Sequence, residues 1–423
     1  MPTPSLLIVP ARFKTGKLYS QIPTSGAGDF TVTRNTAARR FDSAGLVASV
    51  ASGIPRLDYY TSGGVTGCPA LLVEPAGTNL CLQSENLDIF PWNPTNTAVT
   101  VNVAGTTDPA GGNTADQIFE TAASGSHFLA QTMTIVSGTT YVGSIFYKKA
   151  TGSPDWMQVA FSTTGLAGFA NFNLTSGTVG LTGAGCTGRI ENYGNGWYRC
   201  TLIQTANANG TSGGPVIVFT NNTNSITRFV SYTGNTATSI YAWGAQLETG
   251  SVATSYIPTT AGTGSRSADV ISVSGAVSGS IGQTEGTIYM EVDIRNMARE
   301  TYLIRIDDGA TANILSLRKL ATNEIRTAIT APTTSGTLNI SSAAFTAGIV
   351  KIAFAYKSGE IALSVNGATA LTANGTFSFA ASLNRITLGS NASASSEFND
   401  RIRAVALYTT RLTNAELATL TTP

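Results

Sequence analysis

Two acidic residues in one strand-like segment are the first candidates for chemistry in this sequence. In the run GTIYMEVDIR, Glu291 and Asp293 are two positions apart, and such residues lie on one face of a β-strand, roughly 7 Å apart. Retaining glycosidases hold two carboxyl groups about 5 to 5.5 Å apart, so the pair raises the question of sugar hydrolysis. A third acidic residue would be needed three positions later, where the chain has Asn296. We therefore predict a solvated outer strand face and no hydrolytic site.

The single histidine limits other forms of catalysis. His127 lies in the Gly- and Ser-rich stretch SGSHF, so any Ser-His-Asp arrangement would depend on this one residue. A histidine in such a stretch is typical of a surface or sheet-edge position. The sequence therefore predicts no catalytic residue, and we expect the chain not to be an enzyme.

Oxygen ligands suited to calcium are grouped at two places. Asp307-Asp308-Gly309 and Asn399-Asp400 offer carboxylate and amide oxygens in loops, which is where proteins bind this ion. Asp-Gly is also an ordinary hairpin-turn sequence, and no complete ligand series follows it. We predict turns at these positions, no bound metal and no cofactor.

The cysteines lack the spacing of a zinc site, because no two of them form a C-x-x-C pair. We expect buried free thiols, which are common in chains that mature in the cytosol. The open alternative is two disulfides, joining the first cysteine to the second and the third to the fourth. The four residues are Cys68, Cys81, Cys186 and Cys200.

Tryptophan rings are the remaining candidates for a site, because sugar recognition uses exposed flat rings with hydrogen-bonding neighbours. Trp92, in FPWNPTN, and Trp156, in SPDWMQ, lie beside turn residues and are the candidate glycan-binding residues. Capping of a hydrophobic core is the open alternative for both. Trp197 and Trp243 lie in strand-like runs, so we expect them to be packing residues in the core.

The composition predicts an all-β protein. Charged residues make up 12% of the 423 residues, against a globular average of about 25%. The polarity comes from Thr, Ser, Asn and 44 glycines, which are typical of turns and solvated strand faces. The net charge of +1 gives no basis for binding nucleic acid or an anionic membrane. No run approaches the roughly 18 apolar residues of a membrane span, and we expect no signal peptide.

Three regions follow one another along the chain. Residues 1–85 are irregular and rich in Pro, Gly and Ser, whereas residues 86–262 and 263–423 alternate apolar and polar side chains with period two. Such alternation over short runs is the pattern of antiparallel sandwiches. The stretch 257–269 lacks this period and is the expected linker. We thus predict an irregular N-terminal attachment module followed by two antiparallel jelly-roll β-sandwiches.

Local signals predict individual elements. Asn366-Gly367 is a hairpin-turn sequence, and Thr413 with Glu416 forms a capping box that predicts a short terminal helix. The stretch 67–87, GCPALLVEPAGTNLCLQSENL, predicts a joint that begins with a short strand at Leu71–Val73. In the run GTIYMEVDIR, the side chains expected to face the core are Ile288, Met290, Val292 and Ile294.

Several long motifs resemble those of virion proteins of tailed bacteriophages. The run FTVTRNTAARRFDSAGLVASVASGIPRLDY, followed by GCPALLVEPAGTNLCLQSENL, is similar to their opening module. The runs NGWYRC and YAWGAQLETGSVATSYIPTT resemble their carbohydrate-binding-like sandwich. YKSGEIALSVNGA, NRITLGS and FNDRIRAVALYTTRLTNAELATL resemble concanavalin-like, laminin-G-type sandwiches. Gly77 and Arg39-Arg40 depart from the commonest form of the opening module.

The resemblance implies a structural protein of a bacteriophage virion, a fibre or spike on head or tail, assembled in the cytoplasm of the host bacterium. Its opening module would attach to other virion proteins, its sandwiches would contact host-surface polysaccharide, and such appendages are often homotrimers. A purely architectural capsid decoration without glycan binding is the first alternative, and a polysaccharide depolymerase is the second. The motif residues expected to serve attachment are Arg34, Arg39, Asp42, Arg56, Asp58, Glu74 and Asn79.

Overall fold

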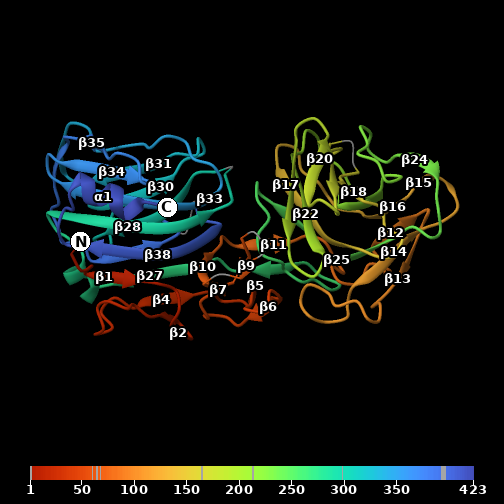
Figure 1. Cartoon of the computed structure of the whole chain (residues 1–423), viewed down its shortest axis with the longest axis horizontal. Helices are drawn as coiled ribbons and strands as arrows, with labels where there is room; N and C mark the ends of the chain where they lie inside the picture. Colours follow the sequence, from red (N-terminus) through yellow and green to blue (C-terminus); the bar gives the residue numbers. More distant parts are fainter. Residues whose placement is uncertain are drawn as a thin grey trace.

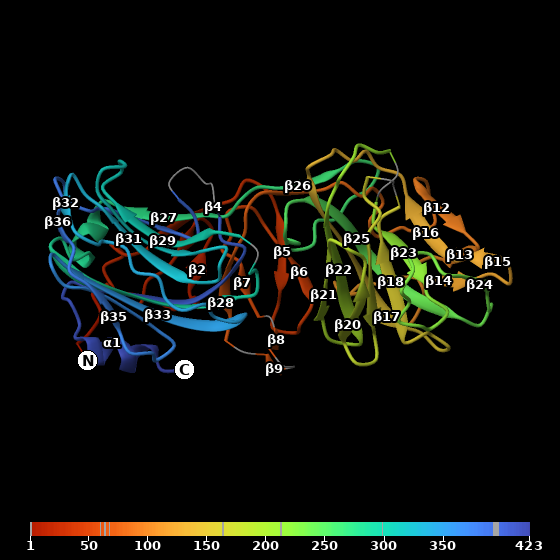
Figure 2. The same cartoon turned by 90° about the horizontal axis from the view of Figure 1, so that it is seen from above.

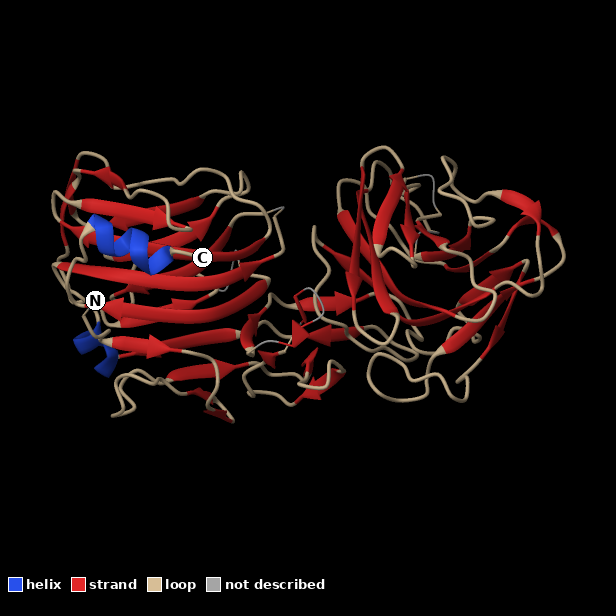
Figure 3. Ribbon diagram, in the orientation of Figure 1, coloured by secondary structure: helices blue, strands red, loops and turns tan. Residues whose placement is uncertain are grey.

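The chain folds into two antiparallel β-sandwiches that lie side by side (Figure 1). Within the described residues almost all regular structure is strand, with one α-helix and one short 3-10 helix (Figure 3). The predicted all-β fold class is confirmed. The computed structural model describes residues 2–59, 61, 62, 65, 66, 68–162, 165–211, 214–297, 299–391 and 397–423.

The terminal sandwich is the body in which both ends of the chain lie (Figure 1). Its first sheet has the order β35-β34-β33-β28-β38-β10-β7, with β1 also pairing with β38, and its second has the order β2-β3-β4-β27-β37-β29-β30-β31. The strands of the first sheet are β1 (Leu6–Ile8), β7 (Leu57–Asp58), β10 (Ala70–Val73), β28 (Glu285–Ile294), β33 (Gly348–Lys357), β34 (Ile361–Val365), β35 (Leu371–Ala373) and β38 (Asp400–Tyr408). Those of the second are β2 (Phe13–Lys14), β3 (Lys17–Leu18), β4 (Phe30–Thr33), β27 (Val270–Ser274), β29 (Thr301–Asp307), β30 (Ile314–Lys319), β31 (Ile325–Thr330) and β37 (Arg385–Leu388).

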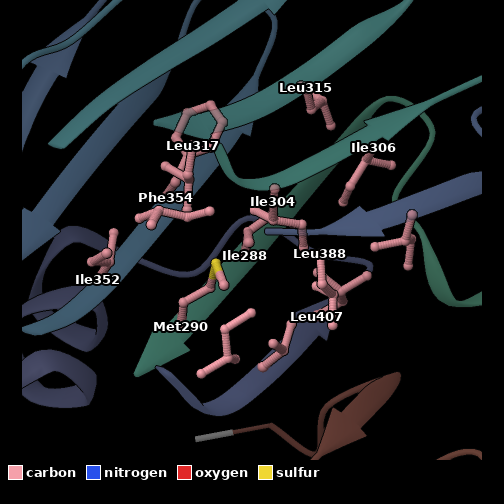
Figure 4. Packing of buried hydrophobic residues seen from close by; sticks show 14 of the residues in the cluster. Ile288, Met290, Ile304, Ile306, Leu315, Leu317, Ile352, Phe354, Leu388 and Leu407 are labelled. Carbon is pink, nitrogen blue, oxygen red and sulfur yellow. The ribbon is translucent and has the colours of Figure 1, made fainter. Parts of the chain in front are cut away.

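The hydrophobic core of the terminal sandwich lies between its two sheets. Figure 4 shows side chains of β28, β29, β30, β33, β37 and β38 pointing toward one another in this layer. Burial of one such aliphatic side chain contributes about 1.5 to 3 kcal/mol, so this layer is the main source of stability. The side chains of β28 that were predicted to face the core are all fully buried in it: Ile288, Met290, Val292 and Ile294.

The segment 1–85, expected as a separate module, supplies strands to both sheets of the terminal sandwich. Leu6 of β1 is in register with Leu407 of β38, and Val32 of β4 is in register with Ile271 of β27. Leu6 and Val32 are buried in the same core as β28. The sequence pattern does not predict this arrangement, because these strands have only two to four residues, too few to show a period. Their pairing partners also lie far along the chain.

The central sandwich is formed by the strands from Trp92 to Thr249. Its sheets have the orders β12-β16-β23-β18-β19-β20 and β13-β14-β25-β17-β22-β21. Apolar side chains of its strands, such as Ile145 and Val159, are fully buried between these sheets. The strands are β12 (Trp92–Thr95), β13 (Thr97–Thr100), β14 (Asp116–Glu120), β16 (Phe128–Gln131), β17 (Thr140–Lys149), β18 (Trp156–Ala160), β19 (Phe169–Asn173), β20 (Thr178–Thr182), β21 (Cys186–Asn192), β22 (Trp197–Thr205), β23 (Val216–Phe219) and β25 (Ser239–Thr249).

The two crossings between the sandwiches lie next to each other. Strand β11 (Gly77–Asn79), which leads into the central sandwich, pairs with β26 (Gly264–Arg266), which leads out of it. The strand predicted at Leu71–Val73 is β10, and a few residues later the Leu80 amide donates to the Leu247 carbonyl of β25. The predicted joint is therefore present, and the central sandwich is an insertion in the terminal one.

Smaller elements complete the fold. The hairpin of β5 (Ala38–Phe41) and β6 (Val47–Val50) lies between the two bodies (Figure 2). The predicted capping box is present, because the Thr413 hydroxyl and the Glu416 carboxylate bond each other's backbone amides at the start of α1 (Asn414–Thr421). Asn366 has a φ of 50° and Gly367 a φ of 75°, as a type I′ turn requires. The remaining elements are η1 (Ala276–Ser280) and the paired strands β8 (Thr61–Ser62) with β9 (Val65–Thr66), β15 (Ser124–Ser126) with β24 (Ser231–Thr233), and β32 (Thr333–Ser335) with β36 (Thr376–Ser378).

Candidate functional site

Buried charged side chains meet where the chain crosses between the sandwiches. Arg56 forms ion pairs with both Glu74 and Asp269, and Arg34 Nη1 lies 3.0 Å from Asp269 Oδ1. These side chains come from the N-terminal segment and from the stretch after β26, so the contacts hold the two crossings together. We call this group the joint network; its members are Arg34, Arg56, Glu74, Ser255, Arg266 and Asp269.

Glu74 lies at the centre of the joint network. Arg266 Nη1 lies 3.0 Å from Glu74 Oε2, and the backbone amide and hydroxyl of Ser255 each donate to the carboxylate at 2.7 Å. Burial by itself would raise the pKa of Glu74, but Arg266, Arg56 and the bond from Ser255 hold that pKa well below its usual range. The carboxylate therefore stays ionised, with a hydrogen-bonding partner on each oxygen.

Asn79 ties the joint to the central sandwich. Its side-chain amide donates to the carbonyls of Ala245 and Ile257, at 3.0 and 2.9 Å. Its Oδ1 accepts from the amides of Cys81 and Leu247, both at 3.0 Å. Because Asn79 is fully buried, it satisfies four backbone groups that have no access to water.

The remaining residues expected to serve attachment also make contacts within the chain. Asp58 is buried and accepts hydrogen bonds from the Phe41 amide and from Arg401 Nε. Asp42 accepts from two amides of the β5–β6 turn, and Arg39 donates to the Val47 carbonyl. With Arg34, Arg56, Glu74 and Asn79 buried as well, most of the motif residues lack the exposure that contact with another protein requires. Arg34, Arg56, Glu74 and Asn79 make their contacts at the crossings between the sandwiches.

The face of the central sandwich that meets the β5–β6 hairpin is aromatic. Trp197 and Trp243 are buried there together with Phe146 and with Val47 of the hairpin, and the Phe146 and Trp243 ring centroids lie 5.3 Å apart. Both tryptophans are thus buried packing residues, as predicted. They lie in the contact with the hairpin, however, and not between the sheets of the central sandwich.

A cleft opens beside the joint network, between the two sandwiches. It has about 770 Å³ of space between its walls, part of it open to solvent. Hairpin β5–β6, strands β21 and β22 of the central sandwich, and the start of β38 all contribute to its walls. We call it the inter-sandwich cleft; its charged lining residues are Arg39, Arg40, Asp58, Glu74, Arg189, Glu191, Arg199, Arg295, Asp400 and Arg401.

Arginines outnumber carboxyl groups in the cleft, six to four. Arg199 is buried, donates to the Ser144 hydroxyl and the Thr254 carbonyl, and lies 5.5 Å from the centre of the Phe146 ring. Arg40 donates to the carbonyls of Phe41 and Leu57. Among the residues that the structure describes, neither arginine forms an ion pair with a carboxylate.

Two of the carboxyl groups in the cleft differ in their surroundings. Asp400 is buried, and this burial raises its pKa to about 7, although the backbone amides of Asn296 and Arg295 donate to it. Glu191 is exposed on β21. At neutral pH, Asp400 is therefore protonated in a large fraction of molecules, which increases the positive character of the cleft.

The two candidate glycan-binding tryptophans lie outside the cleft. Trp92 is only 3% exposed, packs in the core of the central sandwich and donates from Nε1 to the Gln83 carbonyl. Its ring is therefore not available at the surface. Trp156 is half-buried at the start of β18, with its ring over Gly180 of β20. Turn residues on both sides of Trp92 suggest exposure, but they do not reveal that the following strand turns the ring inward.

The acidic pair on β28 is neutralised by neighbouring arginines. Glu291 Oε1 accepts from Arg403 Nε at 2.6 Å, and Asp293 Oδ1 accepts from Arg295 Nε at 2.7 Å. The prediction of a solvated face is wrong for Asp293, which is fully buried, whereas Glu291 is partly exposed. Asp293 of β28 is in register with Arg401 at the start of β38, and this long-range pairing has no signal in the local sequence.

His127 is fully buried, so the prediction of a surface position is wrong. Its Nε2 lies 3.2 Å from the Thr121 carbonyl oxygen and 3.1 Å from that of Ala123, and its ring packs 4.7 Å from the Tyr232 ring. The small residues around it in the sequence allow β15 and β24 to close over the ring. The histidine is a packing residue in the central sandwich.

The Asp-Gly turn is formed as predicted, with Gly309 at a φ of 91°. No group of three or more His, Cys, Asp or Glu side chains in the described ranges could hold a metal ion. None of the helices in this part of the chain is long and apolar enough to span a membrane. The cysteines are free: Cys81 and Cys200 are buried, Cys186 is half-buried, and Cys68, in contrast to the expectation of burial, is exposed.

The comparisons with known proteins concern the two sandwiches. Residues 265–418 match the laminin-G-type model of the concanavalin A-like lectin/glucanase superfamily. This part of the chain is similar to that superfamily's sandwich domains. The match covers the C-terminal portion of the terminal sandwich and leaves out the strands that residues 6–73 add to it. No curated protein matches the chain.

Solved structures with similar folds include carbohydrate-binding modules. The CBM40 module of the Ruminococcus gnavus IT-sialidase is 15% identical, with a TM-score of 0.27, over 33% of this chain and 83% of that one. Domain 4 of AbnA, a GH43 extracellular arabinanase from Geobacillus stearothermophilus in complex with arabinotriose, is 13% identical, with a TM-score of 0.29, over 40% and 82%. The Trypanosoma rangeli sialidase is 14% identical, with a TM-score of 0.29, over 36% and 25%. Similarity at this level gives no information about the ligand of this chain.

Proposed function

We propose that this chain is a non-enzymatic structural protein of a tailed-bacteriophage virion, forming a fibre or spike that contacts host-surface glycans. The proposal combines the resemblance of the opening and closing motifs to virion proteins with the match of residues 265–418 to the concanavalin A-like lectin/glucanase superfamily. It extends to a homotrimeric assembly made in the host cytoplasm and mounted on the particle through other virion proteins.

The observation that carries this proposal is the joint between the two sandwiches. The residues of the phage-like motif form the joint network and the Asn79 contacts. An appendage that bears mechanical load between particle and cell needs its domains fixed in one orientation. A buried ion network across two adjacent crossings supplies such a connection, because opening it would expose uncompensated charges.

The absence of an enzymatic role is part of the proposal. Glu291 and Asp293, the pair with the spacing nearest to a hydrolytic site, are each bound by an arginine. An arginine partner stabilises the ionised carboxylate, whereas a glycosidase needs one of its two carboxyl groups protonated.

The test is binding of the purified protein to a panel of bacterial surface polysaccharides. We expect weak retention by single copies and strong retention when the protein is displayed in many copies on a bead, because avidity adds to weak sites. If the multivalent form retains no polysaccharide, the glycan-binding part of the proposed function is contradicted. The architectural decoration without glycan binding is then the remaining alternative.

A polysaccharide depolymerase is the second candidate, and one observation favours it. Asp400, with a pKa of about 7, and the exposed Glu191 line the same cleft, and two carboxyl groups in unlike surroundings are how glycosidases divide acid and base roles. Incubation of the protein with the polysaccharides it retains decides between the two candidates. Release of reducing ends that is lost in Asp400→Asn would establish the enzyme.

A further inference from the structure

We propose that the inter-sandwich cleft is a binding site for a carboxylate-bearing saccharide, of the uronic acid class, recognised through Arg39, Arg40 and Arg189. This inference rests on the proposed glycan-binding function and assigns its site and the charge of its ligand. The cleft is separate from the tryptophans that sequence analysis selected.

The first argument is the state of these three arginines. Arg189, on β21, is partly exposed and forms no hydrogen bond or ion pair from its side chain within the described ranges. Arg39 donates only to the Val47 carbonyl, at a long 3.4 Å. Arg40 donates to two carbonyl oxygens and lies 5.7 Å from the centre of the Tyr59 ring. Within the described residues none of the three therefore forms an ion pair with a carboxylate.

The second argument is the pairing of two of the four acidic residues that share the cleft. Glu74 is bound by Arg56 and Arg266, and Asp58 is bound by Arg401. These two carboxylates are therefore already paired and do not compete for the three arginines. An anionic ligand would supply the missing partner, and guanidinium groups bind carboxylates with two parallel hydrogen bonds.

The third argument is the remainder of the lining. Phe41 and Tyr193, whose ring centroids lie 4.5 Å apart, provide an apolar surface for the face of a sugar ring. Thr201 and Asn399 add a hydroxyl and an amide group of the kind that bond sugar hydroxyls. Small-ligand sites often lie at a contact between two domains, where polar groups converge beside aromatic walls.

The distribution of charge favours a saccharide over a nucleic acid. The whole chain has a net charge of +1, so it lacks the extended positive surface that binding a long polyanion requires. Six arginines line one bounded cleft, together with four carboxyl groups. A saccharide with a carboxylate on one ring matches both the charge and the mixed polar and aromatic walls.

The experiment is calorimetric titration of the full-length protein with trimers of galacturonate, glucuronate and mannuronate, each beside its neutral methyl ester. At least one acidic trimer should bind, its ester should bind at least about tenfold more weakly, and Arg189→Gln should cause a similar loss. Arg12→Gln is the control, since it removes the same charge from an exposed arginine outside the cleft and should leave affinity unchanged. Arg39→Gln provides a second, independent variant.

The outcomes separate this inference from the proposed function. Retention of neutral polysaccharides without binding of any acidic trimer would overturn the inference and leave glycan binding in place. Equal affinity of an acid and its ester, or wild-type affinity in both Arg189→Gln and Arg39→Gln, would overturn it as well. If neither trimers nor polysaccharides bind, the proposed function fails and the inference fails with it.

Discussion

Arg34 and Asp269 are separated by 235 positions in the sequence, yet Nη1 of one lies 3.0 Å from Oδ1 of the other, with both side chains buried. Arg34 follows β4, which pairs with β27 directly after Asp269. The ion pair therefore fixes the N-terminal segment to the start of the C-terminal part of the terminal sandwich, at the point where the central sandwich is inserted. It makes the opening motif an internal part of the fold.

Removal of one partner from the joint network should destabilise the protein strongly. Glu74→Ala would leave Arg266 buried without its carboxylate and Arg56 with Asp269 as its one remaining partner, and breaking a buried pair in this way costs about 3 to 5 kcal/mol. Urea denaturation followed by tryptophan fluorescence measures the loss. Asp155→Ala is the matched control, because its pair with Lys149 is exposed, and such pairs contribute about 1 kcal/mol or less. Equal effects of the two variants would contradict the role of the network.

Asn79 should be as important for the stability of the joint as the charged residues of the joint network. Asn79→Ala would leave two buried carbonyls and two buried amides without their partner, and each unsatisfied group costs about 1 to 3 kcal/mol. We expect faster proteolysis between the sandwiches and a lower free energy of unfolding. Asn93→Ala is the control, because this exposed asparagine makes one local hydrogen bond, and it should change neither the proteolysis rate nor the free energy of unfolding. A wild-type cleavage rate in Asn79→Ala would show that the joint does not depend on Asn79.

Asp400 should make stability fall as pH rises. Its pKa is about 7 in the folded chain against an ordinary 3.8, mainly because of burial, with Asp293 nearby adding to the shift and Arg401 opposing it. Because the fold favours the neutral carboxyl, Asp400 adds to the free energy of unfolding. This addition is fully present below about pH 4 and is lost as pH rises through 7. Asp400→Asn cannot ionise, and its melting temperature should decline between pH 5 and pH 8 by at least about 2 °C less than that of the wild type. If the melting temperatures of Asp400→Asn and the wild type decline equally, ionisation of Asp400 does not contribute to the pH dependence.

The alternating strands and the local signals could be predicted from the sequence. The inward residues of β28, the capping box at Thr413 and the type I′ turn at Asn366 each depend on interactions within a few residues. Burial of Trp197 and Trp243 followed in the same way from the strand-like runs around them. In these cases the local pattern and the tertiary structure favour the same arrangement.

Other features depend on partners far along the chain, which local patterns do not encode. Strands β1, β4 and β10 are too short to show a period and are stabilised by β38 and β27. Asp293 and His127 are buried because distant strands cover them. The inter-sandwich cleft was not predicted, since its arginines come from three separated segments; the cluster at Arg39 and Arg40 was the one visible signal.

The central claim is that the terminal sandwich is discontinuous and that the central one is inserted into it. Asn79 and Gly264 are directly paired, so residues 80–263 can be replaced by an Asn-Gly turn of the type that closes a two-residue hairpin. We predict that this shortened protein unfolds in one cooperative thermal transition, whereas residues 263–423 alone, without β1, β4 and β10, show no such transition. A cooperative transition in residues 263–423 alone would contradict the account.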